Sequence, residues 1–154
     1  MHCESRSLPF TSRCHRVEIR FGAIHLSIET LIVDDSDAFR RVLQARLENI
    51  GCKVVGEART ASEGLALFRS LRPRLITLDL VMPGSEDTNA ETLFQTIRRE
   101  SPGTAMLVIS VSRRDLNAAH FLAAGAVAYL EKNFMNFDRL AITLKGVFPE
   151  LDKS

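Results

Sequence analysis

The stretch LIVDDS, at residues 31–36, decides the fold. Its apolar half is typical of a buried strand, and its polar half places two acids where that strand ends. Ser36 can then cap a helix, because the apolar residues after it recur at helical spacing up to Gly51, which suits a C-terminal cap. The sequence therefore predicts a strand followed directly by a helix.

The same strand-then-helix pattern repeats along the chain. Thr60 with Glu63 is typical of a capping box that opens the second helix, and Pro73 ends that helix. Parallel strands need crossover connections, so these units predict a doubly wound α/β fold, a five-stranded parallel sheet with helices on both faces. The expected strands are residues 31–33, 53–57, 75–78, 106–109 and 127–130, and the expected helices lie between 36 and 51 and at 60–71, 90–99, 114–124 and 136–148.

The composition of the chain excludes several classes of function. The 154 residues are 45% hydrophobic and 25% charged, as in one globular domain, and the net charge of +1 argues against direct binding to nucleic acid. The three cysteines show no CxxC or Cys/His spacing, so neither a disulfide framework nor a zinc site is expected. No apolar run is long enough to span a bilayer, and we expect a cytoplasmic protein.

Residues 1–27 differ from the rest in being basic and poor in acids. We expect an N-terminal extension that is either flexible or forms a short extra strand at 17–21, as an edge strand or a dimer contact. A transit peptide is the alternative, although Pro9 and Gly22 interrupt its helix. The expected domain spans 28–150, and residues 151–154 are expected to be a C-terminal tail.

Polar residues stand at the ends of the expected strands. Asp34 and Asp35 follow the first strand, and Asp79 follows the third. Ser110 ends the fourth, and Lys132 follows the fifth. The carboxyl ends of parallel strands share one crevice, so we expect these side chains to converge. Three crowded carboxylates repel one another unless a cation shares their site, and Mg²⁺ prefers such oxygen ligands.

This set of side chains fits phosphoryl transfer. Beside a divalent cation, a carboxylate can attack a phosphoryl group and form an acyl phosphate, and Asp79 is the suitable nucleophile. Lys132 and Ser110 can offset the charge that develops on the phosphoryl oxygens. Taken singly, an acid after a strand is often a helix cap, a loop lysine is usually solvated, and a serine often marks a turn. The joint placement favours a site.

Four ordered motifs resemble the receiver domain of two-component response regulators, from about residue 29 to 148. This resemblance implies a flavodoxin-like fold of the receiver type, the stand-alone kind used in chemotaxis and phosphorelays. The motifs are LIVDDS at 31–36, LDLVMPG at 78–84, VIS at 108–110 and GAVAYLEK at 125–132.

The resemblance also implies the parts of a metal and acceptor site. Asp79 matches the phosphoacceptor. Asp35 and Asp79 match direct ligands of Mg²⁺ (or Mn²⁺), and Asp34 matches a ligand that acts mainly through water. Val81 matches the residue whose backbone carbonyl completes the metal site.

Three further residues match the catalytic and switch positions of the family. Lys132 matches its lysine, and Ser110 matches the hydroxyl residue that moves toward the phosphoryl group. Tyr129 matches the aromatic residue that enters the vacated space. Without the motif, Tyr129 would be a half-buried strand aromatic with its hydroxyl at the surface.

The sequence departs from the family at two places. Asn133 follows Lys132, where receivers usually have a proline and often a cis peptide bond. Two outcomes are open: a trans bond with Lys132 displaced, or a cis bond that costs about 2.5–4 kcal/mol. The acidic loop at 85–89 is also longer than usual, either to tune partner choice or as a solvated loop.

The expected function is that of a single-domain response regulator, which takes a phosphoryl group from a histidine kinase or a histidine phosphotransfer protein. It would signal to a downstream protein as a monomer or a phosphorylation-dependent dimer, and catalyse only its own phosphorylation and dephosphorylation. The alternatives are a receiver-like binding module that acts without phosphorylation, or a receiver fragment of a larger regulator. Val81 counts against a phosphatase, which would have a second aspartate there, and the acids after the first strand count against a flavin carrier.

Overall fold

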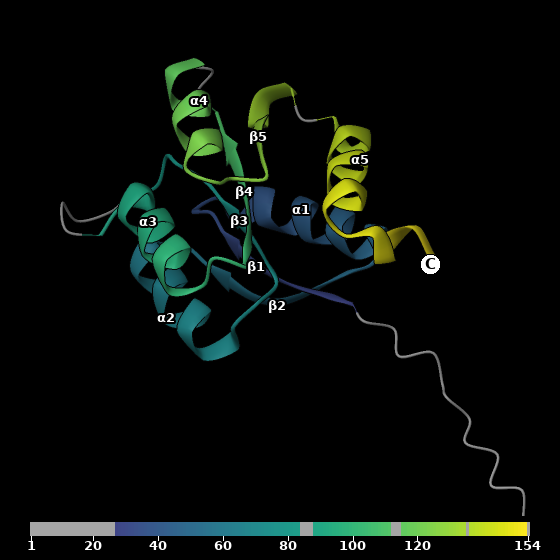
Figure 1. The fold of residues 1–154 in the computed structure, drawn as a ribbon, viewed down its shortest axis with the longest axis horizontal. Helices are drawn as coiled ribbons and strands as arrows, with labels where there is room; N and C mark the ends of the chain where they lie inside the picture. Colours follow the sequence, from purple (N-terminus) through teal and green to yellow (C-terminus); the bar gives the residue numbers. More distant parts are fainter. Residues whose placement is uncertain (1–26, 84–87, 112–114, 135, 154) are drawn as a thin grey trace, which may run out of the picture.

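The structure is a computed structural model that describes residues 27–83, 88–111, 115–134 and 136–153. Its centre is a parallel sheet of five strands in the order β2-β1-β3-β4-β5 (Figure 1). The predicted doubly wound α/β fold is therefore confirmed. The strands are β1 (Ile28–Val33), β2 (Cys52–Ala58), β3 (Leu75–Leu78), β4 (Ala105–Ser110) and β5 (Ala128–Glu131).

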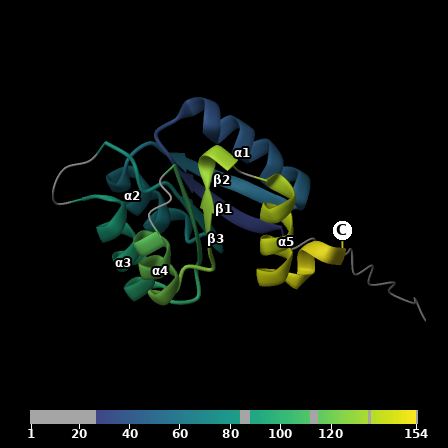
Figure 2. The same cartoon turned by 90° about the horizontal axis from the view of Figure 1, so that it is seen from above.

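Helices cover both faces of the sheet. α1 and α5 pack on one face, and α2, α3 and α4 pack on the other (Figure 2). The α-helices are α1 (Asp37–Ile50), α2 (Ala61–Leu71), α3 (Ala90–Glu100), α4 (Asp115–Ala123) and α5 (Phe137–Val147), and two 3-10 helices are η1 (Lys132–Phe134) and η2 (Pro149–Lys153).

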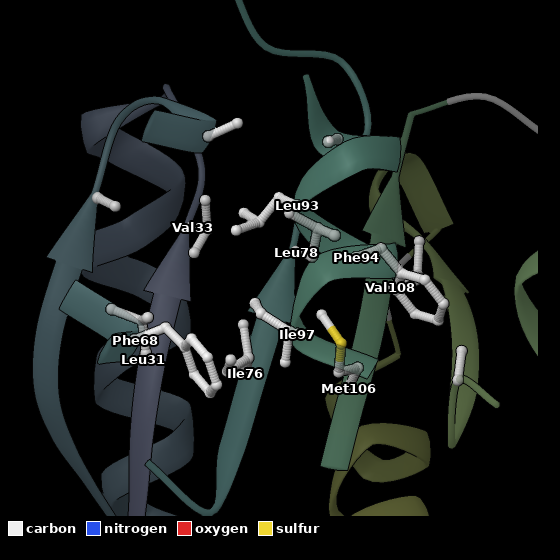
Figure 3. Close-up of a cluster of buried hydrophobic side chains, with 14 of the residues drawn as sticks. Leu31, Val33, Phe68, Ile76, Leu78, Leu93, Phe94, Ile97, Met106 and Val108 are labelled. Atoms are coloured by element: carbon white, nitrogen blue, oxygen red, sulfur yellow. The ribbon is translucent and has the colours of Figure 1, made fainter. Parts of the chain in front are cut away.

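The central strands β3 and β4 are buried along their whole length, and their mostly apolar sequences fit strands that helices cover on both faces. In β1, Leu31 and Val33 point toward the helices α2 and α3, and Ile32 points toward α1 and α5. The buried side chains thus form one hydrophobic cluster on each face of the sheet. Figure 3 shows the cluster under α2, α3 and α4, with Phe68 of α2 packed beside the side chains of β1 and β3. Helices packed on both faces thus hold the sheet, including the ends of its strands, in place.

The helix ends follow from local side-chain chemistry. The Ser36 hydroxyl accepts a hydrogen bond from the Phe39 backbone N–H at 3.3 Å, and Gly51 ends α1 with a φ of 105°, as its place after the helix predicts. Thr60 accepts the Glu63 N–H, but the Glu63 carboxylate accepts from the N–H of Arg59 rather than from that of Thr60. The predicted capping box is therefore right in its first half only.

The segment after α5 belongs to the domain. Leu151 in η2 is 4% exposed and packs in the cluster under α1 and α5. The boundary expected after residue 150 therefore falls inside this 3-10 helix, and residues 151–153 are not a free tail. The strand expected at 17–21 and most of the long acidic loop lie outside the described residues. No helix in the described ranges is long and apolar enough to cross a membrane.

Candidate functional site

Three acids meet at the point where the strand order reverses. Asp34 and Asp35 follow β1, and Asp79 follows the neighbouring strand β3. From β1 the chain passes to β2 on one side of the sheet, and it then crosses to β3 on the other side. One carboxylate oxygen from each acid lies within 4.8 Å of those of the other two. The expected convergence of the three acids is present.

Lys132 reaches two of these acids. Its Nζ lies 2.6 Å from Asp34 Oδ2 and 2.8 Å from Asp79 Oδ2, and 4.5 Å from the centre of the Phe39 ring. Burial alone would lower the pKa of Lys132, but its bonds to the two carboxylates outweigh burial and raise the pKa above its usual value. Its ammonium group therefore stays charged inside the site.

The bond between Lys132 and Asn133 is trans, since the described residues contain no cis peptide bond. From the sequence, two outcomes were open: a trans bond with Lys132 displaced, or a strained cis bond. The structure shows a trans bond with Lys132 still hydrogen-bonded to Asp79. Lys132 begins the 3-10 helix η1, so the chain turns after the lysine without a proline.

Asp79 is 3% exposed and has a partner on each carboxylate oxygen. Oδ1 accepts the backbone N–H of Val81 at 3.0 Å, and Oδ2 accepts from Lys132. Burial raises the pKa of Asp79, the hydrogen bonds from Lys132 and Val81 oppose that rise, and the Asp34 carboxylate adds to it. Further positive charge beside Asp79 would thus stabilise its ionised form.

The donor set fits a divalent cation. Asp34, Asp35 and Asp79 formally carry three negative charges, and Lys132 carries one positive charge, which leaves two negative charges in the pocket. Asp34 and Asp79 are buried, whereas Asp35 is exposed at the rim. Carboxylate oxygens are the ligands that Mg²⁺ prefers, and those of Asp34 and Asp79 keep lone pairs beyond their present hydrogen bonds. The acidic pocket can therefore hold a metal ion.

Ser110 and Tyr129 lie on the same face of the sheet. Ser110 ends β4 beside β3 and is fully buried. Tyr129 pairs with Val108 across β4 and β5, and both pack in the cluster under α2, α3 and α4. Ser110 follows Val108 by two residues and so faces the same side. The two expected switch residues therefore share the face that α4 covers.

The family model of the response regulator receiver domain matches residues 30–145 of this chain. The chain belongs to this family.

Two named proteins are similar to most of this chain. The chain is 32% identical over 122 residues to the response regulator GacA of Pseudomonas aeruginosa, which covers 79% of this chain and 55% of GacA. It is 28% identical over 104 residues to the chemotaxis protein CheY of Thermotoga maritima, which covers 68% of this chain and 84% of CheY. This receiver thus spans about half the length of GacA and most of that of CheY.

A solved structure supports the fold. A CheY-like receiver domain protein from Methanospirillum hungatei JF-1 superposes with a TM-score of 0.70 at 29% identity, over 82% of this chain and 98% of that one. The family, the sheet order and the acidic pocket agree on a receiver.

One residue of the receiver site was not predicted from the sequence. Arg40 in α1 is 5% exposed, and its Nη1 donates to the backbone carbonyl oxygen of Asp34 at 2.7 Å. The signal was present, because Arg40 lies three residues before Leu43 and seven before Leu47 on the buried stripe of α1. An arginine in such a stripe needs buried partners, and here one of them belongs to the acidic loop.

Proposed function

We propose that Asp79 accepts a phosphoryl group from a histidine kinase or a histidine phosphotransfer protein, and that phosphorylation changes the protein contacts of this receiver. The observation that carries the proposal is the position of Asp79, which contacts Lys132 and lies beside Asp34 and Asp35. Membership of the receiver family supports the class of phosphoryl donor.

The residues of the site fit this transfer. A carboxylate oxygen of Asp79 attacks the phosphorus of a phosphohistidine, and a new O–P bond forms. The P–N bond breaks, its electron pair stays on the imidazole nitrogen, and that nitrogen takes up a proton. The Lys132 ammonium group, already 2.8 Å from Asp79, offsets negative charge on the phosphoryl oxygens. When bound by Asp34, Asp35, Asp79 and the Val81 carbonyl, Mg²⁺ supplies further positive charge there.

We expect water to remove the phosphoryl group from Asp79. An acyl phosphate is a reactive mixed anhydride, and a water molecule that attacks its phosphorus restores the Asp79 carboxylate and releases phosphate. We therefore expect the receiver to catalyse its own phosphorylation and dephosphorylation and no metabolic reaction.

Ser110 and Tyr129 are the proposed readout of the phosphorylated state. A phosphoryl group adds charge and acceptor oxygens at the end of β3, which draw the Ser110 hydroxyl toward them. Tyr129, on the same face of the sheet, then moves into the space that Ser110 leaves. The surface of α4, β5 and α5 changes as a result, and a downstream protein or a second copy of the receiver binds the changed surface.

The sequence offers a direct optical test. Tyr129 is the single tyrosine of the chain, which has no tryptophan, so tyrosine emission reports on this residue alone. With Mg²⁺, the phosphoryl mimic beryllofluoride should change the emission of Tyr129 and shift the amide resonances of Asp79 and Ser110. The variant Asp79→Asn should show neither change. A wild-type protein that binds Mg²⁺ but does not respond would instead favour a binding module that acts without phosphorylation.

A further inference from the structure

Arg40 joins three elements around the acidic loop. Its Nη1 donates to the Asp34 carbonyl oxygen at 2.7 Å, and its Nη2 donates to Asp37 Oδ1 in the first turn of α1. Its Nε lies 3.5 Å from Glu57 Oε2 on β2, at ion-pair distance. The side chain is 6% exposed, so these contacts replace most of its hydration. One guanidinium group thus connects the end of β1, the start of α1 and the end of β2.

The other polar groups of Asp34 are held as well. Its backbone N–H donates to the Ala58 carbonyl oxygen at 2.9 Å. Its Oδ1 accepts the Ser36 N–H at 2.8 Å, and its Oδ2 contacts Lys132 at 2.6 Å. The bond from Arg40 to the carbonyl oxygen completes this set, so Asp34 has little freedom to rotate.

The Asp34 carbonyl belongs to the planar peptide group that leads into Asp35. Its orientation therefore sets the direction in which Asp35 leaves the strand. The Asp35 side chain is exposed, and within the described part of the chain no side chain is hydrogen-bonded to its carboxylate. The position of that carboxylate thus depends on the backbone that Arg40 holds.

We propose that Arg40 is a positioning residue for the cation site: by holding the peptide between Asp34 and Asp35, it keeps the Asp35 carboxylate close to Asp79. This inference rests on the proposed function for its biological meaning, since the cation serves phosphoryl transfer there. It does not rest on it for its test, because metal binding can be measured without any phosphoryl donor.

Mn²⁺ binding to the full chain, measured by electron paramagnetic resonance, tests the inference. Arg40→Met keeps the apolar stem and removes the guanidinium group. We expect about tenfold weaker Mn²⁺ binding, as is typical when a group that orients a metal ligand is lost. Labelling by acetyl phosphate should then need a correspondingly higher Mg²⁺ concentration for half-maximal rate, while the rate at saturating Mg²⁺ stays close to that of the wild type.

Leu47→Ala is the matched control in the same helix. Leu47 is fully buried and has no polar group, so its truncation destabilises the domain without touching the acidic loop. Its folded fraction should bind Mn²⁺ as the wild type does. A purely structural Arg40 would behave like Leu47, with a smaller folded fraction and an unchanged affinity.

Folded Arg40→Met that binds Mn²⁺ as tightly as the wild type would overturn the inference. Should this variant not fold, Arg40→Lys takes its place, because it keeps the charge but lacks the planar fork whose two terminal nitrogens donate to the Asp34 carbonyl oxygen and to Asp37. Weaker Mn²⁺ binding by Arg40→Lys supports the inference, and unchanged binding contradicts it. A wild type that binds Mn²⁺ but accepts no phosphoryl group would contradict the proposed function alone.

Discussion

The helices α1 and α4 differ in how firmly they are held. α1 buries Arg40, Leu43 and Leu47, and both of its ends are capped, by Ser36 and Gly51. The loop with Asp34 and Asp35 leads directly into its first turn. The two acids after β1 therefore lead into a helix that the core and its caps hold in place.

α4 is attached by far less. Of its described side chains only Phe121 is buried, where it packs edge-on against Phe94 of α3 at 5.0 Å between ring centres. Its second link to α3 is an exposed pair, His120 Nε2 and Glu91 Oε1 at 2.9 Å. A pocket opens between α4 and the start of α3, lined by Leu80, Asn89, Ala90, Glu91, Asn117 and Phe121. The comparison teaches that the receiver is fixed where the proposed phosphoryl transfer needs precision and loosely held where the proposed readout needs movement.

Truncation of one buried side chain in each helix should give the largest effect and tests this difference. Leu47→Ala should lower the free energy of unfolding of the whole domain by about 2–5 kcal/mol, measured by urea denaturation. Phe121→Ala should lower it by less, because α4 can detach while the sheet stays folded. Hydrogen exchange should then accelerate in α4 and stay unchanged in α1. Equal acceleration in both helices after Phe121→Ala would refute the contrast.

Lys132→Met tests how strongly the site depends on the positive charge of Lys132. The variant keeps the packing against Phe39 and leaves Asp34 and Asp79 buried without a positive partner. Without divalent ions, the free energy of unfolding should fall by about 3 kcal/mol. Added Mg²⁺ should restore more stability to the variant than it gives to the wild type, because it binds a more negative pocket. Thermal unfolding with and without Mg²⁺ measures both effects, and equal Mg²⁺ gains in the two proteins would count against the electrostatic account.

The pair between α3 and α4 predicts a small, pH-dependent effect. Burial alone would raise the pKa of Glu91, but the hydrogen bonds from Gln95 and His120 outweigh it and lower the pKa. A lowered pKa in the folded state means that the carboxylate stabilises the fold above the ordinary glutamate pKa, and that this stability is lost as the pH falls through the lowered value. Glu91→Gln should therefore be less stable than the wild type at neutral pH, by under about 1 kcal/mol because the pair is exposed.

The difference between Glu91→Gln and the wild type should vanish in acid. Urea denaturation of the two proteins across the acidic range measures it. A difference that stays constant at every pH would show that the Glu91 carboxylate has no part in holding α4.

Much of the fold could be predicted from the sequence because local and global signals agree. The apolar run before Asp34 and the acid after β3 mark the two strand ends, and Ser36 and Gly51 mark the ends of α1. η2 was not predicted, since a short 3-10 turn has no periodic pattern and Leu151 is buried through its packing in the cluster under α1 and α5.

The three acids of the site could be predicted from the sequence, but the contacts that hold them in place could not. The position of Lys132 Nζ does not follow from local sequence, because it depends on where β5 places the chain relative to β1 and β3. Arg40 escaped notice because arginines are mostly exposed. Its carbonyl partner on Asp34 has no side-chain signature that a motif could reveal.

The most direct test of the central claim is the mass of the intact protein after incubation with acetyl phosphate and Mg²⁺. We predict an increase of one phosphoryl group, located on Asp79 by peptide mapping, and absent both without a divalent ion and in Asp79→Asn. No increase in the wild type at saturating Mg²⁺, or equal labelling of Asp79→Asn, would contradict the assignment of Asp79 as the phosphoacceptor.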